Sequence, residues 1–294
     1  MVTNKSVKKR LGQLKHAYDR LSIGKDALLH LIDEAEIAES VYNSNAIENS
    51  TLTLKDTEKI LLEMELSRAL NLREVYEAKN LARVVTYVRG KVKAQELDQN
   101  LILLLHQMLM GGIDDPIAGR FRAAGEYVRV GSHVAPAPER VEGLIHDALL
   151  AYHGEHSLYF LDKVSKFHLH FENTHPFCDG NGRMGRVLVN YQLQRLGFPP
   201  LIIRHKDKRA YFAAIRVFDE KQHSKAMEKL LTLALFESLH KRLAYLKGET
   251  IIPLADFAKT KDQSGQSISN AARRQTIPAF REKGVWKIAQ DLNL

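Results

Sequence analysis

The chain has 294 residues, of which 45% are hydrophobic and 27% are charged, with only 17 glycines and 8 prolines. This composition excludes the collagen-like, disordered and membrane-embedded classes. Because Cys178 is the single cysteine, the sequence has neither a disulfide framework nor a multi-cysteine zinc site. The length predicts one large domain with an appendage, or two small domains.

The net charge is +8, and basic residues gather toward both ends of the chain. Such ends bind nucleic acid or acidic partners in some proteins, but a solvated helical face explains the same charges. Lys8, Lys9 and Arg10 stand where a signal peptide would need an apolar run. The apolar stretches are also too short to cross a bilayer. We therefore expect a cytoplasmic protein without a membrane partner.

The hydrophobic pattern is mostly helical. Apolar residues between Val7 and Leu21 recur in steps of three and four, and a second helix is expected over residues 26–44. Thr53 and Asp56 predict a capping box at the start of a third helix. Further helices are expected over residues 70–91, 97–110, 138–153 and 161–171. The fold class is therefore predicted to be mainly α.

Glycines and prolines interrupt this pattern between residues 111 and 138, where Tyr127, Val128 and Val130 predict a strand of a small hairpin. After Gly248 the composition changes again. Short helices near residues 254–258 and 268–277 and a strand over 285–288 predict a small appended unit. We therefore divide the chain into four parts, namely residues 1–30, 31–110, 111–247 and 248–294.

One stretch carries the features of a phosphate site: residues 175–186 read HPFCDGNGRMGR and precede an apolar helix over residues 187–196. Two glycines let the backbone turn tightly and approach a ligand, and the start of a helix attracts anions. Arg183 and Arg186 are three residues apart and share a helix face, where both can hold phosphate oxygens. Asp179 is a suitable Mg²⁺ ligand, and His175 is the natural general base.

Each of these residues also has an ordinary explanation, such as a turn, a structural histidine or a solvated arginine. Their order at the start of one helix favours the phosphate site. A metal hydrolase that uses His168 and His170 is the competing enzyme interpretation. Two residues apart on a helix, those side chains point away from each other, and no cysteine or acidic cluster completes a zinc site.

The stretch resembles the signature of the Fic family, in which HPF, any residue, Asp or Glu, GNGR, any two residues and Arg follow one another. Gly119, Arg122 and the segments 128–131 and 133–138 are similar to the family's flap hairpin. Residues 44–49, SNAIEN, are similar to its inhibitory motif, which here comprises Ser44, Glu48 and Asn49. The resemblance covers about residues 30–245. It implies a helical bundle with a β-hairpin flap, to which a small C-terminal appendage, winged-helix-like in one interpretation, is added.

The resemblance implies transfer of AMP from ATP to a Tyr, Thr or Ser hydroxyl of a target protein, self-modification included. His175 would take the proton from the hydroxyl, and Asp179 would hold Mg²⁺ against the α- and β-phosphates. Asn181 and the backbone of Gly180 and Gly182 would surround the phosphates, with Arg183 at the β-phosphate and Arg186 at the γ-phosphate. Gly182 favours AMP transfer, because related Doc toxins have Lys there and transfer phosphate.

Three further sites follow from the resemblance. Tyr211 and Phe212 are candidates for an adenine pocket, although core packing explains them equally well. An extended target segment would add to the flap through main-chain hydrogen bonds, and the flap residues concerned are Arg129, Val130, Gly131, Ser132 and His133. Glu48 would pair with Arg186 in place of the γ-phosphate and inhibit the enzyme, whereas the alternative is an exposed helix glutamate.

Two other functions remain open. The C-terminal part, with Arg273, Arg274, Arg281 and Lys283, is compatible with a DNA-binding helix-turn-helix or winged-helix module. The same surface would also suit target docking or a homodimer. A Fic enzyme that transfers another phosphate-containing group is the remaining alternative.

Overall fold

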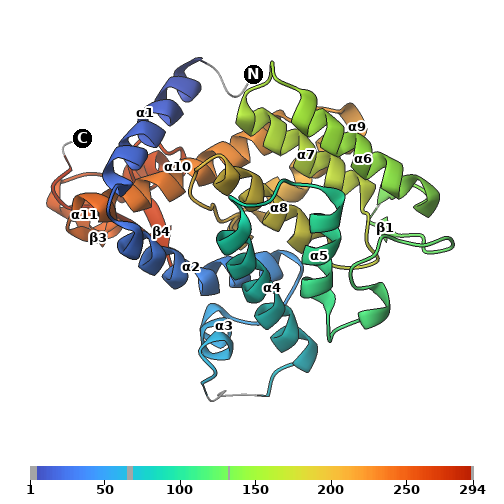
Figure 1. The fold of residues 1–294 in the computed structure, drawn as a ribbon. Coiled ribbons are helices and arrows are strands. Elements are labelled where there is room, and N and C mark those ends of the chain that lie inside the picture. The colour runs from blue at the N-terminus through green and yellow to red at the C-terminus, as the bar shows by residue number, and fades with distance from the viewer. Residues whose placement is uncertain (1–4, 65–68, 132, 293–294) are drawn as a thin grey trace. The chain divides into compact units, whose positions relative to one another are not determined.

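The computed structural model describes residues 5–64, 69–131 and 133–292. It is mainly helical with two small antiparallel sheets, which confirms the predicted fold class. The chain packs into two compact units, each described below by itself (Figure 1). Residues 1–36, 199–202 and 229–294 form the first unit, and residues 37–198 and 203–228 form the second. The division of the chain at residues 30, 110 and 247 stays a prediction.

The second unit is a helical bundle that begins within α2 (Asp26–Ile47). Its other long elements are α3 (Leu54–Leu61), α4 (Leu72–Lys91), α5 (Gln99–Met110), α6 (Pro138–Gly154), α7 (Phe160–Thr174), α8 (Asn181–Arg195) and α9 (Lys208–Lys221). Two short 3₁₀ turns, η1 (Asp115–Ile117) and η2 (His205–Asp207), connect them. Buried side chains such as Leu105, Phe177 and Tyr191 form the core. The helices expected over residues 70–91, 97–110, 138–153 and 161–171 are thereby confirmed within a few residues at each end.

Local signals in the sequence explain where two of these helices begin. The Thr53 side chain accepts a hydrogen bond from the Asp56 amide, and the Asp56 carboxylate accepts one from the Thr53 amide, which confirms the capping box. Helix α8 begins at Asn181, six residues before the expected start of the apolar helix. Gly180 adopts the left-handed conformation, with φ of 79°, and turns the chain into the helix there. The first turns of α8 therefore contain the polar residues of the motif.

The expected hairpin is present and consists of β1 (Arg129–Val130) and β2 (His133–Val134). The strands are antiparallel, with Arg129 opposite Val134 and Val130 opposite His133. Ser132, one of the expected flap residues, lies outside the described residues.

The first unit combines α1 (Lys5–Ser22), the start of α2 and most of α10 (Lys225–Lys247) with the C-terminal elements. These are β3 (Ile251–Pro253), α11 (Leu254–Thr260), α12 (Gly265–Arg273), β4 (Phe280–Glu282) and β5 (Val285–Ala289). The three strands form an antiparallel sheet in the order β3, β5, β4. The second short helix expected there begins at residue 265 and ends at residue 273, so the expected range of 268–277 runs past its end.

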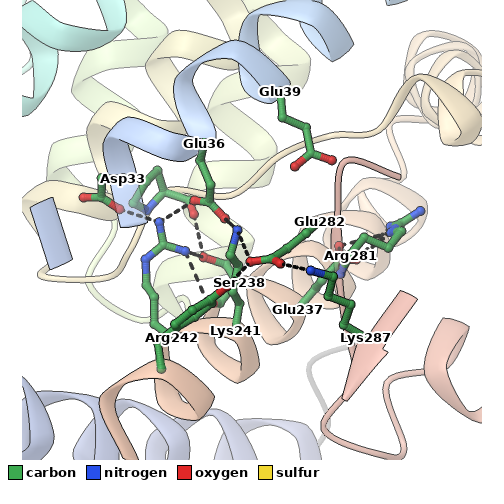
Figure 2. A network of polar contacts seen from close by, with 12 residues as sticks. Asp33, Glu36, Glu39, Glu237, Ser238, Lys241, Arg242, Arg281, Glu282 and Lys287 are labelled. Atoms are coloured by element: carbon green, nitrogen blue, oxygen red, sulfur yellow. Dashed lines mark hydrogen bonds and ion pairs between the residues drawn. The ribbon is translucent and has the colours of Figure 1, made fainter. Parts of the chain in front are cut away.

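A network of charged side chains ties α10 to the C-terminal strands (Figure 2). Lys241 lies 3.0 Å from Glu36 and 3.1 Å from Glu282 of β4, and Arg281 lies 2.7 Å from Glu237. Fully buried Arg242 pairs with Asp33 and Glu36 of α2, at 2.5 and 2.6 Å. These buried partners satisfy one another, and most of α10 lies in the same compact unit as the C-terminal elements.

Among the described residues, we find no helix with both the length and the apolar character that a membrane crossing requires.

Candidate active site

A cavity of about 680 Å³ opens in the second unit beside the start of α8. The motif residues His175, Asp179, Gly180, Gly182 and Arg183 line one side of it. The flap contributes Val130, Gly131 and His133, and α9 contributes Phe212. The structure therefore brings the expected catalytic loop and the expected flap to one concave site, which is where ligand sites are usually found.

His175 ends α7 in a left-handed conformation, with φ of 48°. Its Nδ1 lies 3.1 Å from the Glu172 carbonyl oxygen. Because a carbonyl only accepts hydrogen bonds, Nδ1 carries the proton, and Nε2 of the neutral ring is an acceptor. Burial lowers the pKa of His175 below its usual value of 6.5. The ring is therefore neutral at pH 7, as a general base requires.

The side chain of Asn181 shapes the loop between α7 and α8. Its Oδ1 accepts a hydrogen bond from the Phe177 amide at 2.9 Å, and its Nδ2 donates to the Phe177 carbonyl at 2.8 Å. Both ends of the amide are thus engaged within the loop. Asn181 itself lines the cavity, and its side chain holds the backbone of the loop there.

His106, a buried histidine that was not among the expected site residues, supports the same loop. The ring of His106 stacks on Phe177 with centroids 3.6 Å apart, and its Nε2 lies 3.1 Å from the Asp179 carbonyl. Its Nδ1 accepts a hydrogen bond from the Gly119 amide, so Nε2 donates. Burial lowers the pKa of His106 to about 4 and keeps the ring neutral in this role. His106 therefore connects the loop that carries Asp179 to the segment before the flap.

Arg122 holds the other side of the loop. Its guanidinium donates to the carbonyls of His175 at 2.8 Å, Pro136 at 2.9 Å and Thr174 at 3.3 Å. The Arg122 amide also donates to the Pro176 carbonyl at 3.0 Å. The side chain and the amide of Arg122 thus hold the backbone of residues 174–176. The resemblance had marked Arg122 only as part of the flap.

Two residues of α4 form ion pairs inside the cavity. Arg73 pairs with the carboxylate of Asp179, and Arg183 lies 3.2 Å from Glu77 and 3.3 Å from Asp179. The Asp179 side chain is 38% exposed, so its oxygens are accessible from the cavity. An accessible carboxylate at this cavity fits Mg²⁺, which is commonly held by one or two carboxylates together with substrate phosphates and water. Neither Arg73 nor Glu77 was expected to belong to the site.

Arg186 contacts two of the three residues of the expected inhibitory motif, Ser44 and Glu48. Its Nη1 lies 2.9 Å from Glu48 Oε1, its Nε donates to Ser44 Oγ at 2.9 Å, and its Nη2 donates to the Ser44 carbonyl at 2.8 Å. Glu48 lies in the turn directly after α2, and Asn49 follows in a left-handed conformation. A Cβ atom at residue 182 would overlap the Glu48 carboxylate. Gly182 is therefore what lets this carboxylate lie against the start of α8.

The two aromatic residues of the candidate adenine pocket differ in position. Phe212 is 38% exposed and lines the cavity. Tyr211 is fully buried, and its hydroxyl lies 2.9 Å from His168 Nε2 and donates to Glu172 at 3.2 Å. Burial raises the pKa of Glu172 to about 7. Of the pair, only Phe212 is therefore placed to meet a ligand in the cavity.

Contacts in the same region argue against the alternative metal site at His168 and His170. Burial lowers the pKa of His168 to about 3, and its Nε2 is engaged by Tyr211. The ring of His170 instead packs edge-on against Phe218, with centroids 5.0 Å apart. The two histidine rings therefore lie in different environments, as expected for side chains two residues apart on a helix.

Comparison with known proteins agrees with the geometry. Residues 96–193, which include the flap and the catalytic loop, match the Fic/DOC family. This match identifies a Fic domain within the second unit. The protein adenylyltransferase Fic of Nematostella vectensis is 34% identical over 177 residues, which are 58% of this chain and 41% of that protein. Its counterpart in Drosophila erecta is 27% identical over 295 residues, with 94% and 57% coverage. The chain thus spans about half the length of these curated relatives.

Solved structures share the fold. A Fic domain containing signaling protein from Bacteroides thetaiotaomicron superimposes with a TM-score of 0.72 at 25% identity, which covers 82% of this chain and 97% of that one. A Fic family protein from Desulfovibrio desulfuricans gives a TM-score of 0.69 at 19% identity, over 99% and 98% of the two chains. Glu48 and Phe212 lie outside the family match at residues 96–193, so the match says nothing of these two residues.

Proposed function

We propose that this protein transfers AMP from ATP to a hydroxyl side chain of a protein. The observation that carries the proposal is the neutral His175, whose Nε2 acceptor lies at the same cavity as Asp179 and the start of α8. The relatives named protein adenylyltransferase support the same reaction. Gly182 supports AMP transfer over phosphate transfer, because a lysine side chain there would collide with Glu48 and change the phosphate site.

In the proposed reaction, Nε2 of His175 removes the proton from a Tyr, Thr or Ser hydroxyl of the target. The hydroxyl oxygen forms a bond to the α-phosphorus of ATP, and the bond from that phosphorus to the oxygen bridging to the β-phosphate breaks. Pyrophosphate leaves with the displaced electron pair. His175 carries the proton after the transfer and then releases it to solvent. General-base assistance of this kind contributes about 10² to 10⁴ in rate.

The rest of the site positions the phosphates. Arg183, together with the backbone of Gly180 and Gly182, surrounds the β-phosphate, and Arg186 holds the γ-phosphate. Asp179 would hold Mg²⁺, and the bound ion would supply positive charge against the charge that develops on the leaving group. For Asp179 to do so, its ion pair with Arg73 must open. Arg73 thereby becomes available for a phosphate oxygen.

The flap is the proposed docking site for the target. Its two short strands lie at the cavity, with Val130 43% and Val134 66% exposed. An extended segment that pairs with the edge of this hairpin would be held by main-chain hydrogen bonds, and its hydroxyl would face His175. His133, whose Nε2 lies 2.9 Å from the Asn173 carbonyl, anchors the flap to the end of α7.

We further propose that Glu48 inhibits the enzyme within the chain. The pairs between Arg186 and the segment of Ser44 and Glu48 occupy the side chain assigned to the γ-phosphate. With that position closed, ATP binds with its α-phosphate out of line for attack. Phosphoryl-type transfer depends strongly on alignment, so the pair lowers the rate without touching His175.

The test uses ATP labelled at the α- or the γ-phosphate, with the Glu48→Gly variant as enzyme and Glu48→Gly/His175→Ala as the control. The proposal predicts that α-label stays on protein, that γ-label does not, and that the control incorporates neither. Retention of γ-label would instead indicate transfer of a phosphate. Absence of both labels from protein would contradict the proposed reaction.

A further inference from the structure

The C-terminal elements of the first unit follow a definite order. Helix α10 is followed by β3, by the two short helices α11 and α12, and by the hairpin of β4 and β5. Residues 261–264 form a four-residue turn between α11 and α12, which is the length typical of a helix-turn-helix. The hairpin turn is formed by Lys283 and Gly284, both with positive φ, and β5 lies between β3 and β4 in the sheet. This is the arrangement of a winged helix.

Helix α12 is anchored by one face. Its Ile268 and Ala272 are buried together with Leu254 and Phe257 of α11 and Ile288 of β5. The Ser264 side chain accepts a hydrogen bond from the Ser267 amide and caps the helix. The inner face of the second helix of the motif is thus fixed by a small core of its own.

The outer face of α12 is polar. Gln266, Ser267 and Arg273 are exposed, and Asn270 is half-buried. The Gln266 amide donates to the Asn270 side chain at 3.4 Å, so these two residues lie side by side on this face. Gln and Asn pair with adenine, Arg pairs with guanine and Ser pairs with either through the edges exposed in the major groove. The residue types on this helix therefore suit contact with bases.

The surrounding charge is complementary to a nucleic-acid backbone. Residues 263–281 contain three arginines and no acidic residue, and one of them, Arg281, is paired with Glu237. Arg273 and Arg274 are exposed at the end of α12. Lys259 and Lys261 are exposed at the end of α11, beside the exposed acids Asp256 and Asp262. The acidic residue of the hairpin, Glu282, is held internally by Lys241 and Lys287, at 3.1 and 2.6 Å. Helix-turn-helix proteins place their first helix over the phosphates in the same way.

We propose that this part of the chain binds duplex DNA, with the N-terminal half of α12 in the major groove. Arg273, Arg274, Lys259 and Lys261 would contact the phosphates of the flanking strands. Double-stranded RNA does not suit the surface, because its major groove is deep and too narrow for a helix. This function is separate from AMP transfer and uses none of the residues of the active site.

The first test measures binding of the full-length chain to a fluorescent duplex of mixed sequence, by anisotropy at several salt concentrations and without ATP. We expect a dissociation constant of about 10⁻⁴ to 10⁻⁶ M for non-specific DNA, rising steeply with salt. Arg273→Ala/Arg274→Ala should weaken binding about tenfold and reduce the salt slope by about 1 to 2. The control Lys91→Ala/Lys93→Ala removes the same charge from two exposed residues of the second unit and should change binding little.

The second test concerns sequence reading. From a pool of random duplexes, the wild-type chain should enrich a short preferred site, whereas Gln266→Ala/Asn270→Ala, which keeps the charge, should lose that preference and retain non-specific binding. Absence of salt-dependent DNA binding would overturn the proposal. An equal effect of the control pair would overturn it as well. So would a change in sedimentation mass of the arginine variant without a change in DNA binding, because the surface would then be a contact between copies of the chain.

Discussion

Arg186 of α8 and Glu48, which directly follows α2, form an ion pair at 2.9 Å although they are far apart in the sequence. The arginine side chain is only 6% exposed, whereas the Glu48 side chain is 38% exposed, so solvent reaches the pair from the side of the carboxylate. Ser44 adds two hydrogen bonds to the same guanidinium. Charged groups removed from water in this way need their partners. A ligand that displaces Glu48 from Arg186 must therefore supply an equivalent negative charge, as a phosphate does.

His175→Ala should reduce AMP transfer by about 10² to 10⁴, because the neutral Nε2 acceptor is lost. The backbone contacts of Arg122 with residues 174–176 do not involve the imidazole ring. The fold and ATP binding should therefore persist, which thermal unfolding and calorimetric titration of ATP would verify. Equal rates of α-label incorporation by the two proteins would remove His175 from the mechanism.

The rate of transfer should fall on the acid side of the pH profile. Burial lowers the pKa of His175, and a base acts only when deprotonated. The rate should thus stay level around pH 7 and decline at a pH below 6.5, the ordinary pKa of histidine. Glu172, whose pKa burial raises to about 7, is the rival group. Glu172→Gln should keep the acid decline, and a profile that becomes flat in this variant would assign the decline to Glu172.

The ion pair between Arg73 and Asp179 predicts competition with the metal. Asp179→Ala should lose Mg²⁺-dependent turnover, since its carboxylate is the proposed ligand. Arg73→Ala should instead lower the Mg²⁺ concentration needed for half-maximal rate. Because both side chains are partly exposed, the pair is weak, and a shift of about twofold is expected. Metal titrations of the initial rate measure both effects. An unchanged Mg²⁺ requirement in Asp179→Ala would place the metal elsewhere.

Gly185 of α8 predicts a stability effect that arises from close packing. A Cβ atom there would overlap the Glu172 carboxylate and press on the His168 ring. Gly185→Ala should therefore destabilise the fold by about 1 to 3 kcal/mol. Gly143 of α6 is a matched helical control, since a Cβ there meets nothing within 4 Å. Gly143→Ala should stabilise by about 0.5 to 1 kcal/mol. Denaturant unfolding of both variants compares them, and equal effects would contradict the packing described here.

The sequence alone predicted those structural features that have a local cause. The capping box of Thr53 and Asp56, the hairpin around Gly131 and the order of residues in the catalytic loop all depend on neighbours within a few positions. The expected start of the apolar helix lay after the true start of α8, because the first turns of α8 are polar. Arg183 and Arg186 are buried there and form ion pairs, and a search for apolar periodicity does not detect buried charged residues.

Other parts of the site could not be predicted because they depend on long-range contacts. Arg73 and Glu77 resemble ordinary surface residues of α4 until the fold brings them to Asp179 and Arg183. His106 lies in an apolar helix with no local sign of the loop that it supports. Tyr211 and Phe212 are adjacent in the sequence, but helix geometry directs one into the core and the other to the cavity.

The most direct test of the account compares initial rates of α-label incorporation for the wild type, Glu48→Gly, Arg186→Ala and the double variant. Removal of the Glu48 carboxylate leaves Arg186 available for the γ-phosphate, so Glu48→Gly should be faster than the wild type, by roughly tenfold or more if alignment limits the rate. In the Arg186→Ala background the same change should give no gain. Equal rates for the wild type and Glu48→Gly, or an equal gain with and without Arg186, would contradict the inhibitory pair.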